Sequence, residues 1–207
     1  MIRDQRIQEA LFVVVDVETT GMSPANDRIT EIAMMKVQNG TLVDEFSTLV
    51  NPLQTIPASI TRITGIDNLM VRDAPPAREV VPFIAEFLEG GIFVAHNAEF
   101  DWGFVTHTAR RERGIELTNP RLCTVKLSGK IFPQLPSKSL GPVTDFLQIK
   151  IPERHRASGD AYATALVLVK YLSFLQKHHG LQTVGEVLNF QFAKRPASNL
   201  TMHRRHS

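Results

Sequence analysis

The stretch that decides the fold is Leu11-Phe12-Val13-Val14-Val15-Asp16-Val17-Glu18-Thr19-Thr20-Gly21. Its first five residues are apolar and rich in valine, without polar alternation, which is typical of a strand buried on both faces. Two acids then interrupt the apolar run, and the last three residues are typical of a turn that ends a strand. We therefore expect residues 11–15 to form a central strand of a sheet that is covered on both sides.

The segments on either side of this strand predict a mixed sheet. Asn39-Gly40 stands between the apolar runs Ile29–Val37 and Thr41–Val50, a strong signal for a β-hairpin. Further strands are expected at Ile92–Ala95 and, at an edge, Arg121–Thr124. Helices are expected at Pro57–Thr64, Pro76–Leu88, Ala98–Arg113, Ser139–Leu147 and Gly159–His178. This order predicts an α/β fold, a mixed five-stranded β-sheet with helices on both faces.

Composition indicates one domain and a tail. A chain of 207 residues with 43% apolar content buries one full core. We expect a domain over residues 1–180 and a tail over 181–207, in which a short helix at Thr183–Phe192 precedes a flexible basic segment. No apolar run near the N-terminus approaches the roughly 20 residues of a membrane span, so no membrane association is expected. The single Cys123 excludes an internal disulfide and favours the cytoplasm.

Four acids stand where strands end or helices begin. Asp16 and Glu18 lie two apart on a strand and therefore project onto the same face, where unpaired carboxylates repel each other unless a cation neutralises them. Asp101 follows the fourth strand and Asp160 begins the last long helix. Carboxylate oxygens are the ligands that Mg²⁺ or Mn²⁺ prefers. Each acid also fits a plain role: a solvated strand end, a partner of the helix dipole at Asp101, or an N-cap at Asp160.

The turn after the first strand and one loop histidine are further candidates. Thr19 and Thr20 carry hydroxyls, and Gly21 is free to adopt a positive φ, so backbone N–H groups there could approach a nucleotide closely. The alternative is a turn that only ends the strand. His155 lies in a loop, where a lone histidine is usually just exposed. A formal net charge of +2 predicts nucleic-acid binding only weakly, so any function must rest on the site.

Three segments together resemble one family. Asp16-Val17-Glu18-Thr19-Thr20-Gly21, His96-Asn97-Ala98-Glu99-Phe100-Asp101 and His155-Arg156-Ala157-Ser158-Gly159-Asp160 are similar to the three exonuclease motifs of the DEDDh family. That family includes the proofreading epsilon subunit of bacterial DNA polymerase III. The resemblance runs from about Leu11 to Leu172 and takes in Asn26–Ile29, Ile63–Ile66 and Leu135–Leu140 between the motifs. A histidine five residues before the last aspartate distinguishes this branch from relatives that carry tyrosine there.

The resemblance implies a ribonuclease H-like fold and a chemistry. The reaction is 3′→5′ hydrolysis of phosphodiester bonds at the 3′ end of single-stranded DNA, with release of nucleoside monophosphates, in proofreading or repair. Two Mg²⁺ or Mn²⁺ ions would be held by four acids, with Asp16 bridging both, Glu18 and Asp160 on the nucleophile side, and Asp101 on the second ion largely through water. His155 would be the general base, since an ordinary histidine pKa of about 6.5 suits that role near neutral pH.

The resemblance also implies contacts with the substrate. They would involve Thr19, Thr20, Gly21, Ile63, Thr64, Asn97 and Phe100, although Ile63 and Phe100 fit core packing equally well. A free-standing exonuclease for RNA or oligonucleotides stays an alternative, and an inactive nucleic-acid-binding or interaction module is a weaker one. The tail has four apolar residues with two possible roles. They would either dock the tail on a DNA polymerase or clamp, or cap the domain. These residues are Val184, Val187, Leu188 and Phe190.

Overall fold

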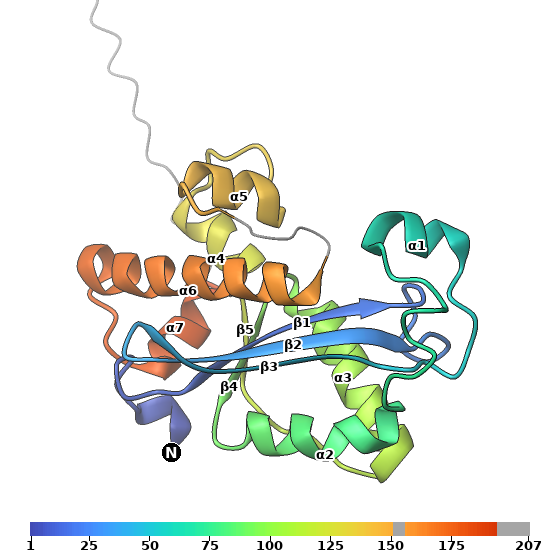
Figure 1. Cartoon of the computed structure of the whole chain (residues 1–207). Helices are drawn as coiled ribbons and strands as arrows, with labels where there is room; N and C mark the ends of the chain where they lie inside the picture. The colour runs from blue at the N-terminus through green and yellow to red at the C-terminus, as the bar shows by residue number, and fades with distance from the viewer. Residues whose placement is uncertain (151–155, 194–207) are drawn as a thin grey trace, which may run out of the picture.

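The computed structural model describes residues 1–150 and 156–193. Its elements in chain order are η1 (Ile2–Asp4), β1 (Phe12–Thr19), β2 (Ile29–Gln38), β3 (Thr41–Leu49), α1 (Ala58–Thr64), α2 (Ala77–Leu88), β4 (Ile92–Ala95), α3 (Ala98–Arg113), β5 (Arg121–Cys123), α4 (Thr124–Ile131), α5 (Leu140–Phe146), α6 (Ala157–His179) and α7 (Val184–Phe190). The sheet separates α6, α5 and α4 on one side from α2 and α3 on the other (Figure 1). The predicted α/β fold with helices on both faces is therefore confirmed.

The sheet has five strands in the order β3-β2-β1-β4-β5, so β1 lies in the middle as predicted. It pairs antiparallel with β2 and parallel with β4. Val13 and Val15 belong to the apolar cluster under one face, whereas Phe12 and Val14 belong to the cluster under the other. The Asn39-Gly40 hairpin is also confirmed, with both residues at positive φ (51° and 71°).

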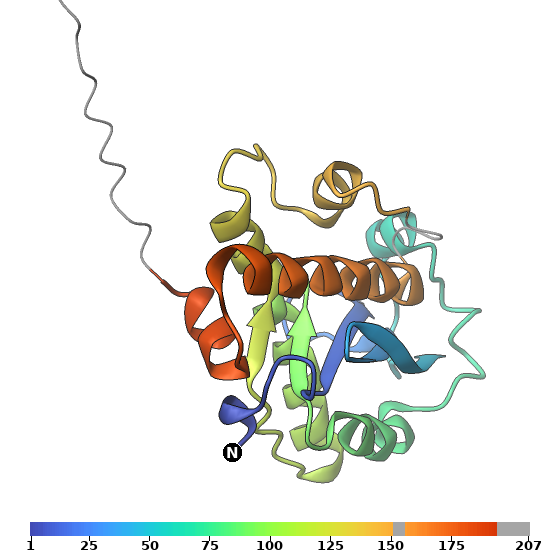
Figure 2. The ribbon, with the colours of Figure 1, turned by 90° about the vertical axis from the view of Figure 1, so that its left-hand side faces the viewer.

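The parallel pairing of β1 and β4 brings their carboxyl ends to the same edge of the sheet. Helix α6 crosses one face and packs on β1 and β2 (Figure 2). It approaches the sheet closely because the buried residues of its first half are mostly small, among them Ala157, Gly159, Ala161 and Ala163. The start of α6 and the end of β1 therefore meet at one edge, where α1 also lies (Figure 1).

One α-helix, α4, was not predicted, and neither was the short 3-10 helix η1. Strand β5 runs directly into α4, and Cys123 is both the last residue of the strand and the N-cap of the helix. With no turn residue between them, the sequence carries no boundary signal there. Leu127 and Ile131 are buried one turn apart, and the Ser128 hydroxyl lies 2.6 Å from the Tyr171 hydroxyl of α6. Packing against α6, rather than intrinsic propensity, stabilises this helix. The helices that were predicted are all found, with their ends shifted by at most two residues.

The C-terminal helix α7 is packed onto the body of the protein, beside η1. Its buried Val184, Val187 and Leu188 join the core cluster that underlies α6. This favours the capping interpretation, since these side chains are not free to dock a partner. The predicted boundary after residue 180 stays a prediction, and this packing supports a domain that includes α7. Among residues 1–150 and 156–193, no helix combines the length and apolar character that crossing a bilayer requires.

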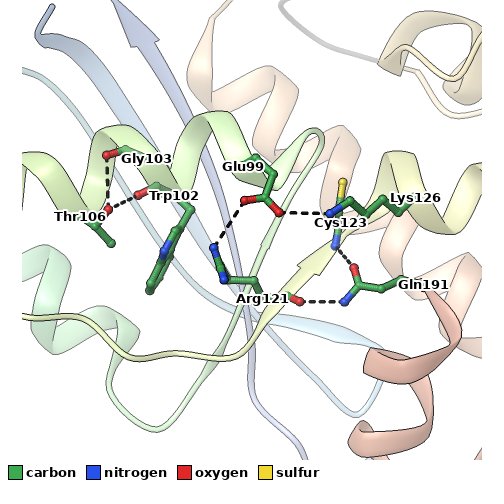
Figure 3. Close-up of polar contacts among 8 residues, drawn as sticks. All are labelled: Glu99, Trp102, Gly103, Thr106, Arg121, Cys123, Lys126 and Gln191. Atoms are coloured by element: carbon green, nitrogen blue, oxygen red, sulfur yellow. Dashed lines mark hydrogen bonds and ion pairs between the residues drawn. The ribbon is translucent and has the colours of Figure 1, made fainter. Parts of the chain in front are cut away.

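Just after α7, Gln191 completes the open edge of β5 (Figure 3). Its side-chain oxygen accepts the Cys123 N–H at 3.0 Å, and its amide donates to the Arg121 carbonyl at 2.9 Å. Gln191 thus makes the hydrogen bonds that a neighbouring strand would make. Because an unpaired strand edge attracts other chains, this contact also protects the sheet.

Candidate active site

Three carboxylates meet at the carboxyl end of β1. Asp16 and Glu18 come from the strand itself, and Asp160 is the fourth residue of α6. One oxygen of each carboxylate lies within 4.8 Å of the others, close enough for all three to bind one metal ion. The N-cap of α6 is Arg156, so the alternative that Asp160 caps this helix is wrong. The predicted same-face arrangement of Asp16 and Glu18 is confirmed.

The fourth acid, Asp101, lies beside this group in the first turn of α3. Its side chain is almost fully buried, and its carboxylate accepts the backbone N–H of Val17 at 3.2 Å. Since Val17 separates Asp16 from Glu18, this bond places Asp101 next to both. Asp101 is not one of the three carboxylates within 4.8 Å of each other. Its location fits a ligand of a second, neighbouring metal ion better than a fourth ligand of the same ion.

The electrostatics of the four acids favour a bound cation. Burial raises the pKa of Glu18 to about 8, and the negative charges of Asp160, Glu31 and Asp101 add to this effect. Burial also raises the pKa of Asp101 to about 8. Burial, and then the charges of Asp101, Asp160 and Glu18, raises the pKa of Asp16 well above its ordinary range. Crowded oxygen donors with uncompensated charge are the ligand set that a hard divalent cation requires.

Comparison with known proteins identifies the family. Residues 13–168 match the family model RNase_T, described as Exonuclease. The chain belongs to this exonuclease family. The match spans all three candidate segments, and it confirms the resemblance on which the sequence analysis relied.

The relatives of this chain include a PolC-type DNA polymerase III and a DNA polymerase III subunit epsilon. The PolC-type DNA polymerase III of Caldanaerobacter subterraneus subsp. tengcongensis is 42% identical over 179 residues, which cover 86% of this chain but 13% of that polymerase. The DNA polymerase III subunit epsilon of Aquifex aeolicus is 36% identical over 173 residues, covering 84% of this chain and 86% of that subunit. A structure of Exonuclease X in complex with 5′ overhanging duplex DNA has a TM-score of 0.69 at 26% identity, covering 87% and 99%. These neighbours confirm the ribonuclease H-like fold.

Sequence reasoning missed a buried ion pair beside the acids. Glu31 on β2 stands directly opposite Glu18 in the β1–β2 register. It is 4% exposed and receives two N–H groups of the Arg156 guanidinium, the shortest contact being 2.7 Å. Nothing in the local pattern of β2 indicates this pair, because its members are 125 positions apart. Only the tertiary fold brings them together.

His96, the first residue of the second motif, holds two segments behind the site. Its Nε2 lies 2.9 Å from the Lys138 carbonyl and its Nδ1 lies 2.8 Å from the Thr124 hydroxyl. Because a carbonyl only accepts, Nε2 carries the proton and Nδ1 accepts from Thr124. Burial lowers the pKa of His96 to about 4, which keeps the ring neutral near neutral pH. His96 therefore connects the end of β4 to the start of α4 and to the segment before α5.

The turn after β1 is held mainly by internal hydrogen bonds. The Thr20 hydroxyl accepts the Arg28 N–H at 3.0 Å and the Gln54 side-chain amide at 2.6 Å. The Thr19 hydroxyl donates to the Gly21 carbonyl at 2.6 Å. Both threonines are buried, so the structure favours the interpretation that their hydroxyls shape the turn.

Gly21 does not use the positive φ that a glycine is free to adopt, because the glycines with positive φ in the described residues are Gly40, Gly65, Gly90, Gly114 and Gly180. Gly21 is required for a different reason. A Cβ there would lie 2.5–2.6 Å from the Asp27 carboxylate, which accepts the Ser23 N–H at 2.8 Å. The group that closely approaches Gly21 is thus the Asp27 side chain, which belongs to the same turn.

Replacing Gly21 by alanine should destabilise this exonuclease by about 1–3 kcal/mol, because the new methyl group overlaps a carboxylate that is fixed in place. Gly129 is the matched control: it lies inside α4 with nothing within 4 Å of its Cβ position, so Gly129→Ala should be neutral or stabilise by up to about 1 kcal/mol. Urea unfolding of both variants measures the difference. Equal urea midpoints for the two variants would show that the turn accommodates the methyl group without loss of stability.

The other predicted substrate contacts occupy different environments. Ile63 is 60% exposed on α1, so the core-packing alternative is wrong for this residue. Thr64 is buried, and its hydroxyl donates to the Ile60 carbonyl and accepts the Ile66 N–H. Phe100 is partly buried, with its ring centroid 4.9 Å from that of Phe104, which supports packing. Asn97 is exposed in the left-handed conformation (φ 86°) just before α3. His155 lies outside the described residues.

In the absence of a divalent ion, this exonuclease should lose stability as the pH rises through about 8. The folded-state pKa values of Glu18 and Asp101 lie near 8, above those of the unfolded chain, so folded protein holds protons that unfolded chain releases. This stabilising contribution is present below the unfolded pKa values and is lost as the pH passes the folded ones. His96 does not oppose it, because above about pH 6.5 the ring is neutral in both states.

Melting temperatures in a chelator at about pH 6.5 and about pH 9 measure this loss. Saturating Mn²⁺ should raise the melting temperature more at the higher pH, where the carboxylates have fewer protons to release on binding. A flat profile in the chelator would contradict the raised pKa values.

Proposed function

We propose that this chain is a metal-dependent 3′–5′ exonuclease that releases nucleoside monophosphates from the 3′ end of single-stranded DNA. The observation that carries this proposal is the group of three carboxylates within 4.8 Å, with buried Asp101 beside it. Membership in the exonuclease family supports the reaction. The names of the polymerase relatives and of the DNA-bound neighbour support DNA as substrate.

The residues present fit a pair of divalent ions, Mg²⁺ or Mn²⁺. Glu18 and Asp160 would hold the ion on the nucleophile side, Asp16 would bridge the two, and Asp101 would hold the second. Such ions supply an activated water and stabilise the leaving 3′ oxygen. His155 is proposed to accept the proton of the attacking water, and its place in the sequence next to α6 supports this role.

Contacts with the terminal nucleotide are proposed at the same edge. The exposed side chain of Ile63 is available for an apolar contact with a base, which would be sequence-tolerant. Since the Thr19 and Thr20 hydroxyls serve the turn, the contribution of that segment would come from its backbone. Asn97 is exposed close to Asp101 and would contact the nucleotide through its amide, whereas the packing of Phe100 leaves it a supporting role.

Digestion of end-labelled oligonucleotides tests the proposal. Single-stranded DNA and the matching RNA are labelled at either end and incubated with Mg²⁺, Mn²⁺ or a chelator, using wild type and His155→Ala. We expect DNA to shorten from its 3′ end, only with metal and only with wild type. Preferential shortening of RNA would favour the free-standing RNA exonuclease. Cleavage of neither substrate by a protein that binds metal would favour an inactive binding module.

Association with a replicative DNA polymerase is a separate part of this proposal. It is supported by the names of the relatives, not by α7, whose apolar residues are packed into the body. A pull-down of purified polymerase III subunits by the full chain measures it. Recovery of no subunit would leave a free-standing nuclease.

A further inference from the structure

We infer that Glu31 and Arg156 are a positioning pair that holds Asp160 at the metal site. The inference rests on the proposed function, because it names residues that support the same centre. Neither residue is one of the four acids, and both come from segments that the sequence analysis did not connect. The pair joins strand β2 to the first turn of α6, the helix that carries Asp160.

The geometry of the pair is that of a fork against a carboxylate. The Arg156 Nη2 lies 2.7 Å from Glu31 Oε1, and Nε lies 3.1 Å from Oε2. The Glu31 side chain is 6% exposed, whereas that of Arg156 is 34% exposed. A planar guanidinium that contacts both oxygens fixes distance and orientation together, which an ammonium group does not do.

Glu31 also caps α6 from outside the helix. The first N–H groups of a helix lack partners within it, and a side chain of the N-cap residue normally accepts one of them. Arg156 is the N-cap, but its side chain has only donors, and it makes no side-chain cap bond. Instead, Glu31 Oε2 accepts the Ala157 N–H at 2.9 Å. The start of α6 is thus tied to the sheet by the backbone as well as by Arg156.

These contacts determine where Asp160 lies. Asp160 is one turn beyond Ala157, and its own N–H donates to the Arg156 carbonyl at 3.1 Å. Glu31 stands opposite Glu18 on the neighbouring strand, so the same carboxylate that anchors α6 is beside a ligand from β1. The Arg156 cation also partly offsets the charge of Glu31, which is a fifth acid beside the site. The pair therefore fixes the position of the first turn of α6, and it also affects the net charge beside the four acids.

Two variants and a matched control test the pair. Glu31→Gln keeps the shape but removes the charge, and Arg156→Lys keeps the charge but removes the fork. The control is Glu116→Gln, which breaks an exposed pair of the same kind, with two Arg110 contacts of 2.7 Å. Mn²⁺ affinity of the free protein is measured by electron paramagnetic resonance, alongside kcat and KM on the oligonucleotide.

We expect Glu31→Gln to lower Mn²⁺ affinity and kcat by about 10–100-fold with KM within about twofold of wild type, as for other residues that orient metal ligands. Arg156→Lys should lose less than Glu31→Gln but clearly more than the Glu116→Gln control. Wild-type behaviour of Arg156→Lys together with a loss in Glu31→Gln would overturn the positioning role of the fork. The role of the pair would then be charge compensation alone.

Wild-type Mn²⁺ affinity and kcat in both variants, with only a lower melting temperature, would overturn the whole inference. If Glu31→Gln does not fold, Arg156→Lys alone decides, because its side chain is one-third exposed and its charge is kept. A wild type that binds Mn²⁺ but cleaves nothing would contradict the proposed function alone. In that case the Mn²⁺ affinities of the variants still decide the role of the pair.

Discussion

Replacing Asp16 by asparagine should abolish hydrolysis and, at the same time, raise the stability of the metal-free protein. Activity should fall by about 10³-fold or more, because the ions that Asp16 is proposed to bridge contribute several kcal/mol of charge stabilisation. Stability should rise because burial and four neighbouring acids raise the pKa of Asp16, so its charged form is unfavourable in the folded state. A gain of roughly 1–2 kcal/mol, or about 2–8 °C, is expected near pH 8.

The measurements are the digestion assay and thermal unfolding in a chelator. Asp44→Asn is the matched control, since Asp44 is exposed on β3 and pairs only weakly with Lys36, at 3.4 Å. It should change stability by less than about 0.5 kcal/mol and leave activity intact. A metal-free Asp16→Asn protein that is less stable than wild type would show that Asp16 has a structural role at the end of β1. Retained activity would contradict its place as a ligand.

Much of the fold was predictable because its signals are local. The valine run of β1, the Asn39-Gly40 turn and the glycines that end α1 and α3 each act within a few residues. The four acids were predictable for another reason. Each stands in a motif, and the resemblance of three motifs in order placed together residues that local pattern alone could not connect.

The unpredicted features depend on contacts between distant segments. The sequence around Glu31 does not indicate that this side chain is buried, and its partner Arg156 is 125 positions away. Ile63 and Thr64 are neighbours with the same predicted role, yet one is exposed and the other buried, because which face of α1 meets the body is decided by packing. The requirement for Gly21 comes from the position of Asp27, not from its own φ. Such features follow from the assembled turn or sheet.

Ending the chain after residue 180 should unfold the protein or cause it to aggregate. The truncation removes Val184, Val187 and Leu188, whose burial contributes about 1.5–3 kcal/mol each, a large share of the 5–15 kcal/mol that stabilises a typical domain. It also removes Gln191, which leaves the β5 edge open to other chains (Figure 3). Circular dichroism and size-exclusion chromatography should show lost cooperative unfolding and large species.

A chain ending after residue 193 is the control, because it keeps α7 and Gln191 and should melt like the full chain. Gln191→Ala isolates the edge: the buried Cys123 N–H loses its partner, which should cost about 1–3 kcal/mol without unfolding the protein. If the chain of residues 1–180 instead melts cooperatively at the full-chain temperature, α7 is an appendage and the domain ends where the sequence predicted. If it fails while the control of residues 1–193 is stable, the exonuclease domain includes α7, since core cluster and sheet edge both depend on that helix.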